Sequence, residues 1–184
     1  MVDITKIIGR LGNQMFLFSF AYNYARKNKM DDRYFQEPKF FAEHSDEIKS
    51  LFQNEIPPLR PKVAIHVRRG DYINNGFYVD LMKTDYYEKS MGVFKGESFI
   101  VFSDDIEFCK KQEIFKDCEF IHGTEVSDMN NMASCTGHII ANSSFSWWAA
   151  YISPYTKKII APSKYNWYSD GRERTKCPET WIRI

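Results

Sequence analysis

The sequence predicts an α/β fold organised around a parallel β-sheet. From residue 63 onwards, short apolar runs typical of buried strands alternate with stretches that have helical periodicity. This alternation is typical of a parallel sheet with right-handed crossover connections. With 184 residues, 43% hydrophobic and 27% charged, the chain is long enough for one well-packed core and short for two full domains.

The first residues predict one strand–turn–helix unit. Residues 4–8 read as a strand, residues 9–14 as a glycine-rich turn, and residues 15–29 as a helix with aromatic residues at helical spacing. Such a unit brings backbone N–H groups close to a ligand, so Asn13 and Gln14 are candidates for ligand contact. The turn has only two glycines and no Gly-Lys-Ser/Thr, and a helix cap explains Asn13 and Gln14 equally well.

A stiff connector follows this unit. Residues 30–59 contain two clusters of large apolar residues, which indicate two short helices, and three prolines then fall between residues 57 and 61. We therefore expect a domain boundary here. Residues 1–60 would form a reduced N-terminal segment, and residues 61–184 would form a Rossmann-like, ligand-binding domain.

The second part of the chain repeats the strand–helix unit. Strands are expected at residues 63–67, 99–102, 118–121, 138–141 and 158–161. Helices are expected at residues 85–94, 106–115, 128–135 and 147–152. Residues 162–184 are expected to form an irregular tail that is rich in aromatic and basic side chains.

Polar residues follow three of these strands at the point where each strand ends. The clusters are residues 66–71, residues 103–105 and residues 142–146. Ligands of open parallel sheets bind beyond the carboxyl ends of the strands. If the three strands are neighbours, all three clusters face one crevice.

The first cluster contains two adjacent arginines, Arg68 and Arg69. Guanidinium groups stay charged and bind oxyanions in a bidentate way, which suits a diphosphate. A solvated basic turn is the alternative for two arginines alone. The neighbouring His66 and Asp71 favour a site, because solvation does not explain four ionisable groups at one strand end.

The third cluster lies where a strand turns into a helix. The hydroxyls of Ser143, Ser144 and Ser146 and the free N–H groups of the helix start are donors, and the helix dipole favours an anion there. Phe145 is a candidate for stacking on a base or sugar, although a place in the core is the more common role of a phenylalanine. The two tryptophans at residues 147–148 are expected to pack against the sheet.

Three aspartates have competing interpretations. Asp104 and Asp105 resemble carboxylate pairs that hold Mg²⁺ or Mn²⁺, but a cap of the following helix is the preferred interpretation. With two arginines and a helix terminus available, no metal is required. Asp128 is a candidate acceptor for the N–H edge of guanine, and a helix cap is at least as common a role for an aspartate there.

The composition excludes several classes. The formal net charge of +1 gives no general attraction to nucleic acid. The four cysteines form no C-x-x-C pair, which argues against a zinc site and is consistent with free thiols in a reducing cytosol. The N-terminus does not have the pattern of a signal peptide, and no run of 18 apolar residues predicts a transmembrane helix.

Four motifs, in the same order along the chain, resemble those of the α-1,2-fucosyltransferases. They are GRLGNQMF at residues 9–16, HVRRGDY at residues 66–72, FSDD at residues 102–105 and IANSSFSWW at residues 140–148. The segment Ile160-Ala-Pro162 with the later Trp167 is similar to the closing segment of that family.

The resemblance implies a GT-B fold, in which two Rossmann-like domains flank the active site. It implies transfer of fucose from GDP-β-L-fucose to the 2-hydroxyl of a galactose-containing glycan, with inversion and without a metal or other cofactor. Residues 61–184 would be the donor-binding domain. In the family, most of the N-terminal domain lies between the first helix and the region that corresponds to residues 34–36 here. In this chain residues 29–33 join that helix and that region directly, so residues 1–60 would be a truncated N-terminal, acceptor-side domain.

The resemblance also implies roles for individual residues. Arg68 and Arg69 would hold the pyrophosphate, and His66 and Asp128 would lie near the guanosine. Asp71 is the candidate catalytic base, within reach of the attacking hydroxyl. The other residues implied at the donor pocket are Asn13, Gln14, Ser143, Ser144, Phe145 and Ser146.

Two alternatives to an active enzyme stay open at this point. One is a non-catalytic GDP-fucose-binding remnant that lost its acceptor domain, and the other is an unrelated nucleotide-binding Rossmann module. As an enzyme, the protein would be a cytoplasmic bacterial transferase with a nucleotide sugar and a glycan as partners. A lipid-linked acceptor would bring it to the inner face of the membrane.

Overall fold

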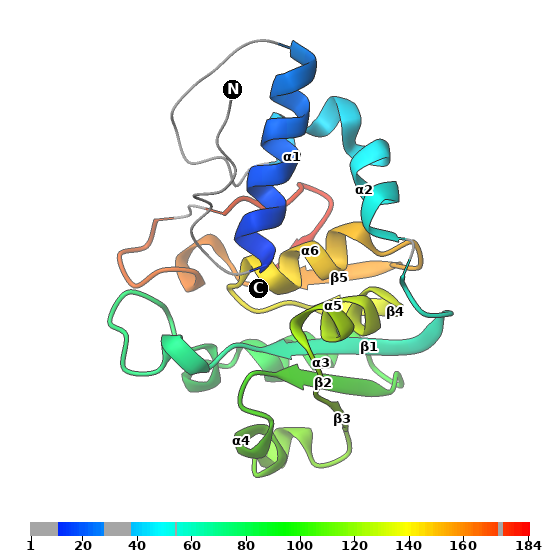
Figure 1. Ribbon diagram of the computed structural model, residues 1–184. Helices are drawn as coiled ribbons and strands as arrows, with labels where there is room; N and C mark the ends of the chain where they lie inside the picture. Colours follow the sequence, from blue (N-terminus) through cyan, green and yellow to red (C-terminus); the bar gives the residue numbers. More distant parts are fainter. Residues whose placement is uncertain (1–10, 28–37, 54, 173–174) are drawn as a thin grey trace.

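Figure 1 shows the computed structural model of the chain, in which residues 11–27, 38–53, 55–172 and 175–184 are described. The strand expected at residues 4–8 and the junction at residues 29–33 lie outside these ranges. The end of the helix expected at residues 15–29, part of the stretch 30–59 and residues 173–174 of the tail also lie outside them, and the other expected elements fall within them.

The described residues form a six-stranded sheet in which every neighbouring pair is parallel. Its strands are β1 (Arg60–Val67), β2 (Phe99–Ser103), β3 (Glu119–Ile121), β4 (Cys135–Ile139), β5 (Lys158–Ala161) and β6 (Ile182–Arg183). The strand order is β3-β2-β1-β4-β5-β6. This is the order of a doubly wound Rossmann sheet, with its topological switch point between β1 and β4. The α/β fold with a Rossmann-like parallel sheet is confirmed.

Helices connect the strands. The α-helices are α1 (Leu11–Lys27), α2 (Ser45–Gln53), α3 (Tyr86–Val93), α4 (Ile106–Lys110), α5 (Glu125–Ala133) and α6 (Ser144–Ile152). Short 3₁₀ turns are η2 (Pro38–Phe40), η3 (Ala42–His44), η4 (Gly70–Tyr72), η5 (Leu81–Lys83), η6 (Glu113–Phe115) and η7 (Lys164–Asn166).

The sheet is covered on both faces, as Figure 1 shows. On one face, Val63, Ile65 and Val67 of β1 pack with residues of α3, α4 and η6. On the other face, Ala64 packs with α5 and α6, and α1 and α2 form a further layer outside α6. Alternate β1 residues therefore pack into the apolar cores on opposite faces of the sheet. Because both faces are buried, the sequence of the strand is a continuous apolar run.

Aromatic side chains join the N-terminal helices to α6. The Phe16 ring centroid lies 4.7 Å from that of Trp147 and 4.9 Å from that of Trp148, and Phe41 stacks on Trp148 at 5.6 Å. Both tryptophans are fully buried, as expected, and they pack against α1 and α2 as well as the sheet. The described residues before Arg60 thus share a core with the sheet, while the division at residue 60 stays a prediction.

Helix α1 begins earlier than expected. Residues 11–14 are its first turn rather than part of a loop, so the predicted turn is wrong for these four residues. A Cβ on Gly12 would lie only 2.5 Å from the Ser144 carbonyl carbon and 2.6 Å from the Phe145 nitrogen. The glycine that suggested a turn therefore permits a close approach of α1 to α6.

Several later boundaries also differ from the expectation. Strand β1 begins at Arg60 and helix α6 at Ser144, each three residues earlier than expected. Helix α5 begins at Glu125 with Thr124 as its cap, so Asp128 does not cap it. Strand β4 begins at Cys135 and not at residue 138, and the helix expected at 106–115 is divided into α4 and η6. The tail adds a strand, because Ile182 and Arg183 pair with Ile160 and Ala161 of β5.

Candidate functional site

A cavity of about 260 Å³ opens at the carboxyl ends of the strands. Residues that follow β1, β2, β3 and β4 line it together. Strand β1 has β2 on one side and β4 on the other, so the three polar clusters of the sequence face one crevice, as expected. The cavity lies at the switch point, where ligands of such sheets bind.

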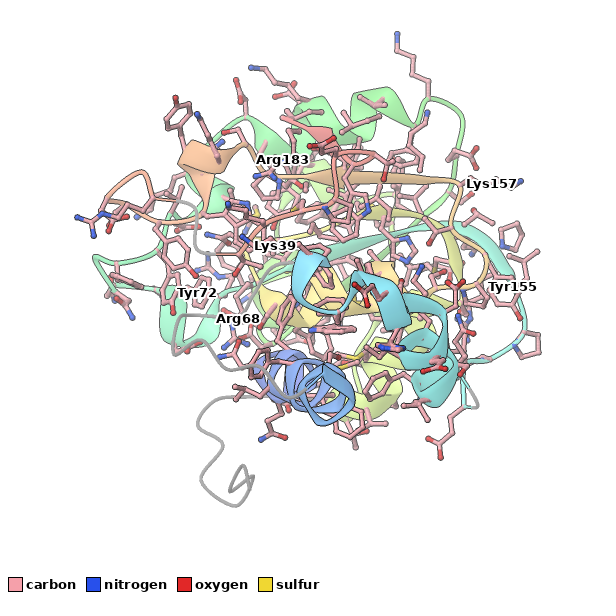
Figure 2. All side chains as sticks on the ribbon, turned by 90° about the horizontal axis from the view of Figure 1, so that it is seen from above. Lys39, Arg68, Tyr72, Tyr155, Lys157 and Arg183 are labelled. Atoms are coloured by element: carbon pink, nitrogen blue, oxygen red, sulfur yellow. The ribbon has the colours of Figure 1, made fainter. Side chains whose placement is uncertain are left out.

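Arg68 forms one wall of the cavity with its guanidinium held on both sides. Its Nη1 lies 2.8 Å from Asp104 Oδ2, and its Nη2 contacts Asp71 Oδ1. The side chain is only 9% exposed, and its Nε is buried with no hydrogen-bond partner among the described residues. Figure 2 shows Arg68 beside Tyr72, whose ring centroid lies 5.2 Å from the guanidinium carbon. One donor of a firmly oriented arginine is therefore unused.

Asp104 fixes this arrangement through both carboxylate oxygens. Oδ1 accepts a hydrogen bond of 2.8 Å from the backbone N–H of Arg69, while Oδ2 receives Arg68. A Cβ on Gly70 would collide with Oδ2, so glycine leaves the room that this carboxylate needs.

Arg69 does not line the cavity. Its guanidinium stacks on the Phe108 ring at 3.3 Å, and its Nε lies 3.3 Å from Asp105 Oδ2. Successive residues leaving a strand point to opposite sides, so one of two adjacent arginines turns away from the crevice. Asp105 caps α4 by accepting from Phe108 N, which confirms the helix-cap interpretation for this aspartate.

The start of α6 forms the opposite wall. Ser143 Oγ accepts from Phe145 N at 3.3 Å, and Ser144 Oγ donates to Asn13 Oδ1 at 2.7 Å. These three residues and Asn13 line the cavity. Ser146 and Gln14 do not. Ser146 is buried beneath the turn, where its Oγ accepts from Ala141 N, and Gln14 is exposed.

His66 lies in the cavity wall as a neutral ring. It is 4% exposed, and its Nδ1 is buried with no partner among the described residues. Burial, and secondarily the charge of Arg68, lowers the pKa of His66 to about 3. Its ring centroid lies 5.3 Å from that of Phe145, so Phe145 lines the cavity and also packs on the core.

Asp128 and His122 mark the end of the cavity near β3. Asp128 is 8% exposed, and its Oδ1 is buried with no partner within the described ranges. Its Oδ2 lies 4.0 Å from His122 Nδ1, and burial raises the pKa of the Asp128 carboxyl. A buried carboxylate oxygen without a partner is an acceptor site for a ligand N–H group.

Sequence reasoning missed an aromatic end of the cavity. Tyr72, Tyr78, Trp167 and Tyr168 line it, and the rings of Tyr72 and Tyr78 stack in parallel at 3.7 Å. Two sequence features could have pointed to these aromatic residues: Tyr72 directly follows Asp71, and the tail is rich in aromatic side chains. The sequence does not reveal that the loop after β1 meets that tail.

Two further findings concern the described residues as a set. Within them, no three or more His, Cys, Asp or Glu side chains are grouped so that they could hold a metal ion, and the four cysteines are free thiols. Among the described helices, none is long and apolar enough to cross a bilayer.

The sequence matches the family model "Glycosyl transferase family 11" over residues 22–184. An α-1,2-colitosyltransferase of Escherichia coli is 36% identical over 179 residues, which cover 82% of this chain and 61% of that protein. The O-antigen biosynthesis glycosyltransferase WbnK of Escherichia coli is 29% identical over 183 residues, or 82% of this chain and 59% of WbnK.

A mammalian protein also matches. The galactoside 2-α-L-fucosyltransferase Sec1 of Mus musculus is 30% identical over 107 residues, which cover 50% of this chain and 28% of Sec1. The chain spans about three fifths of the length of the two bacterial relatives.

Proposed function

This chain belongs to glycosyl transferase family 11, and from that premise we propose that it transfers L-fucose from GDP-β-L-fucose to the 2-hydroxyl of a galactose-containing glycan. Transfer would proceed with inversion and without a metal ion. One observation carries the proposal: Arg68, with a side chain only 9% exposed, and the start of α6 line the same cavity at the switch point of the sheet. The ordered motifs and the family argue against an unrelated nucleotide-binding module.

The diphosphate of the donor would lie between these two walls. The unused Nε of Arg68 supplies a charged donor. The start of α6 supplies the positive end of the helix dipole and neutral N–H donors other than that of Phe145, which Ser143 Oγ already accepts. Both are fixed before the donor binds, so they stabilise the negative charge that develops on departing GDP at little reorganisation cost.

The candidate base is Asp71. It lines the cavity and contacts Arg68, so its carboxylate lies beside the group proposed to hold the leaving diphosphate. An inverting transfer needs a base that removes the proton of the acceptor hydroxyl as that oxygen attacks the anomeric carbon. His66 is neutral, and its unpartnered Nδ1 is proposed to contact the donor without adding charge.

A donor carrying colitose is the second candidate, because an α-1,2-colitosyltransferase is 36% identical to this chain. Colitose and fucose differ only at carbon 3, where colitose has no hydroxyl. In either case the acceptor would be a glycan of a surface polysaccharide, assembled in the cytoplasm of a bacterium. A lipid-linked acceptor would bring the protein to the inner face of the membrane.

Calorimetric titration with GDP tests the binding half of the proposal. We expect Arg68→Ala to weaken GDP binding about 10- to 100-fold, because a charge-assisted hydrogen bond contributes about 1.5–3 kcal/mol. Arg172→Ala is the control, since that side chain is 77% exposed and forms an ion pair with Asp170 at the surface. Equal GDP affinity in the wild-type chain and Arg68→Ala would rule out Arg68 as a diphosphate ligand.

A transfer assay with lactose tests the catalytic half. The wild-type chain is incubated with GDP-fucose or GDP-colitose, and the product is analysed for sugar and linkage. Fucosyl transfer to the 2-hydroxyl of galactose supports the proposal, and exclusive use of GDP-colitose would support the second candidate. GDP binding without transfer from either donor would favour the non-catalytic remnant, and no GDP binding at all would contradict both readings.

A further inference from the structure

The cavity has two chemically different ends. His122 and Asp128 lie at the end that follows β3, whereas Trp167 and Tyr168 lie at the end that follows β5. These strands are four positions apart in the sheet, and the segment after β5 folds back to the end of β4, where Trp167 O accepts from Asn142 Nδ2 at 3.0 Å. A ligand that uses Asp128 and a ligand that uses Tyr168 therefore occupy different parts of the crevice.

Rings at the second end form a continuous aromatic wall, defined here as Tyr72, Phe77, Tyr78 and Tyr168. Tyr72 stacks on Tyr78 at 3.7 Å with an interplanar angle of 4°, and Tyr78 lies 5.5 Å from Tyr168. Phe77 meets the rings of Tyr78 and Tyr168 edge-on, each at 5.1 Å. The wall begins at Arg68, whose guanidinium lies over the ring of Tyr72.

Backbone contacts hold the wall in place. Tyr78 and Tyr168 form an antiparallel β-bridge, and Ser169 N donates to Phe77 O at 3.0 Å. The Tyr72 hydroxyl donates to Asn142 O at 3.1 Å, which ties the wall to the end of β4. The loop after β1 and the segment after β5 thus present preformed rings, which lowers the ordering cost of binding.

The fold does not explain why Phe77 is exposed. This ring is 42% exposed although it lies beside a cluster of aromatic side chains. Phe77 does not line the cavity itself, but it contacts two rings that do, those of Tyr78 and Tyr168. An exposed apolar ring beside a cavity is typical of a surface that contacts a ligand with an apolar face.

We propose that this aromatic wall is the binding surface for the galactose unit of the acceptor glycan. The inference rests on the proposed function and adds the location of the acceptor. With guanosine at the Asp128 end and the diphosphate at Arg68, the transferred sugar points towards the wall. A galactose has one face of C–H groups, which stacks on aromatic rings while its hydroxyls face the open cavity and Asp71.

The test measures acceptor and nucleotide binding separately. Lactose binding to the GDP-saturated chain is followed by saturation-transfer NMR, and GDP binding is followed by calorimetry. Phe77→Ala and Tyr78→Ala are each expected to weaken lactose binding about 5- to 10-fold, from the loss of one stacking ring, and to change GDP affinity less than about 3-fold. Tyr78→Phe keeps the ring and should bind lactose more tightly than Tyr78→Ala.

Tyr165→Ala is the matched control, because Tyr165 is a 65% exposed tyrosine on the same segment that does not line the cavity. It should leave lactose binding unchanged. Circular dichroism of each variant shows whether weaker lactose binding comes from loss of the ring or from loss of the fold. Substitution of Phe77 is less expected to unfold the chain than substitution of Tyr78, since the Phe77 ring is partly exposed.

Three results would overturn the proposal. They are absence of lactose binding to the wild-type chain, lactose affinity unaffected by both alanine substitutions, and a parallel fall of GDP affinity that would assign the wall to the nucleotide. Failure of the proposed function looks different, because then the wild-type chain either does not bind GDP or binds both GDP and lactose without transferring a sugar.

Discussion

At the scale of single residues, Asp71 combines two proposed roles that turnover and GDP affinity report separately. Its carboxylate contacts Arg68, and its side chain is 62% exposed at the mouth of the cavity. Asp71→Asn removes both the proposed base and one negative charge beside the diphosphate. We expect turnover to fall about 100-fold or more, as for loss of a general base. GDP affinity should stay the same or rise slightly.

Initial rates at saturating donor and calorimetry with GDP measure the two effects. Asp85→Asn is the matched control, since Asp85 is also 62% exposed and pairs with a neighbouring cation, Lys89, at 2.7 Å. Wild-type turnover in Asp71→Asn would remove Asp71 from the list of candidate bases, and a large loss of GDP affinity would make it a binding residue instead.

Two buried histidines make stability depend on pH. Burial lowers the pKa of His66 to about 3 and that of His138 to about 4, from an ordinary value of 6.5. Below pH 6.5 the unfolded chain takes up protons at these positions and the folded chain does not, so stability falls as the pH falls. At pH 5 the loss is on the order of 2 kcal/mol for each ring, from 1.4 kcal/mol per pH unit.

Urea unfolding between pH 7.5 and pH 5 measures this slope. His138 has both nitrogens engaged as a neutral ring, with Nε2 at 2.9 Å from Met132 O and Nδ1 at 3.0 Å from Thr156 Oγ1. A free energy of unfolding that is constant over this range would contradict the neutral, buried state of both rings.

The two arginines show the limit of sequence reasoning at this scale. Sequence places Arg68 and Arg69 together at a strand end and offers no way to choose between them. The choice depends on which side of the pleat faces the crevice, and on the partners Phe108 and Asp105, which only the packed helix α4 supplies. Residue types and clusters were predictable, but the direction of each side chain was not.

At the scale of elements, the contact between α1 and α6 depends on Gly12. A methyl group there would collide with backbone atoms of Ser144 and Phe145, which cannot move without moving α6. We expect Gly12→Ala to cost about 1–3 kcal/mol of stability from overpacking, although alanine in a helix is favoured over glycine by about 1 kcal/mol. Urea unfolding should show a net loss.

Gly92→Ala in α3 is the matched control, since no atom lies within 4 Å of a Cβ at that position. This variant should be as stable as the wild type or more stable by up to about 1 kcal/mol. An equal gain of stability in both variants would show that α1 does not pack tightly on α6.

Helix ends were harder to predict than helices. Thr124 and Ser143 both cap helices with their hydroxyls, but the sequence offers several Ser, Thr and Asp residues near each start. Which one caps depends on where the preceding strand stops, and that is decided by pairing with neighbours far away in the sequence. Strand β6 was missed for the same reason, because two residues carry no periodic pattern.

At the scale of the whole molecule, the proposed donor site predicts independence of divalent metal ions. Arg68 and the start of α6 are the groups proposed to hold the diphosphate, and no metal ion is needed in that arrangement. We therefore expect EDTA to change the transfer rate less than about 2-fold, measured with purified chain before and after chelation. Loss of activity that Mn²⁺ restores would contradict this and make Asp104 and Asp105 candidate ligands.

The architecture was predictable because strands buried on both faces leave long apolar runs, and polar clusters mark their ends. The sequence could not show where the aromatic side chains of the residues before Arg60 pack. Phe16 and Phe41 continue the core of the sheet domain around Trp147 and Trp148. Helices α1 and α2 therefore stabilise the wall of the cavity that α6 provides, whether or not they belong to a second domain.

The two outer strands of the described sheet have a consequence for self-association. β3 has three residues and β6 has two, so each edge exposes few unpaired backbone groups. Long, flat edge strands are templates on which other chains add, and short ones limit such growth. The sheet should therefore resist fibril-like polymerisation even though its inner strands are strongly hydrophobic, and aggregation on heating should require prior unfolding.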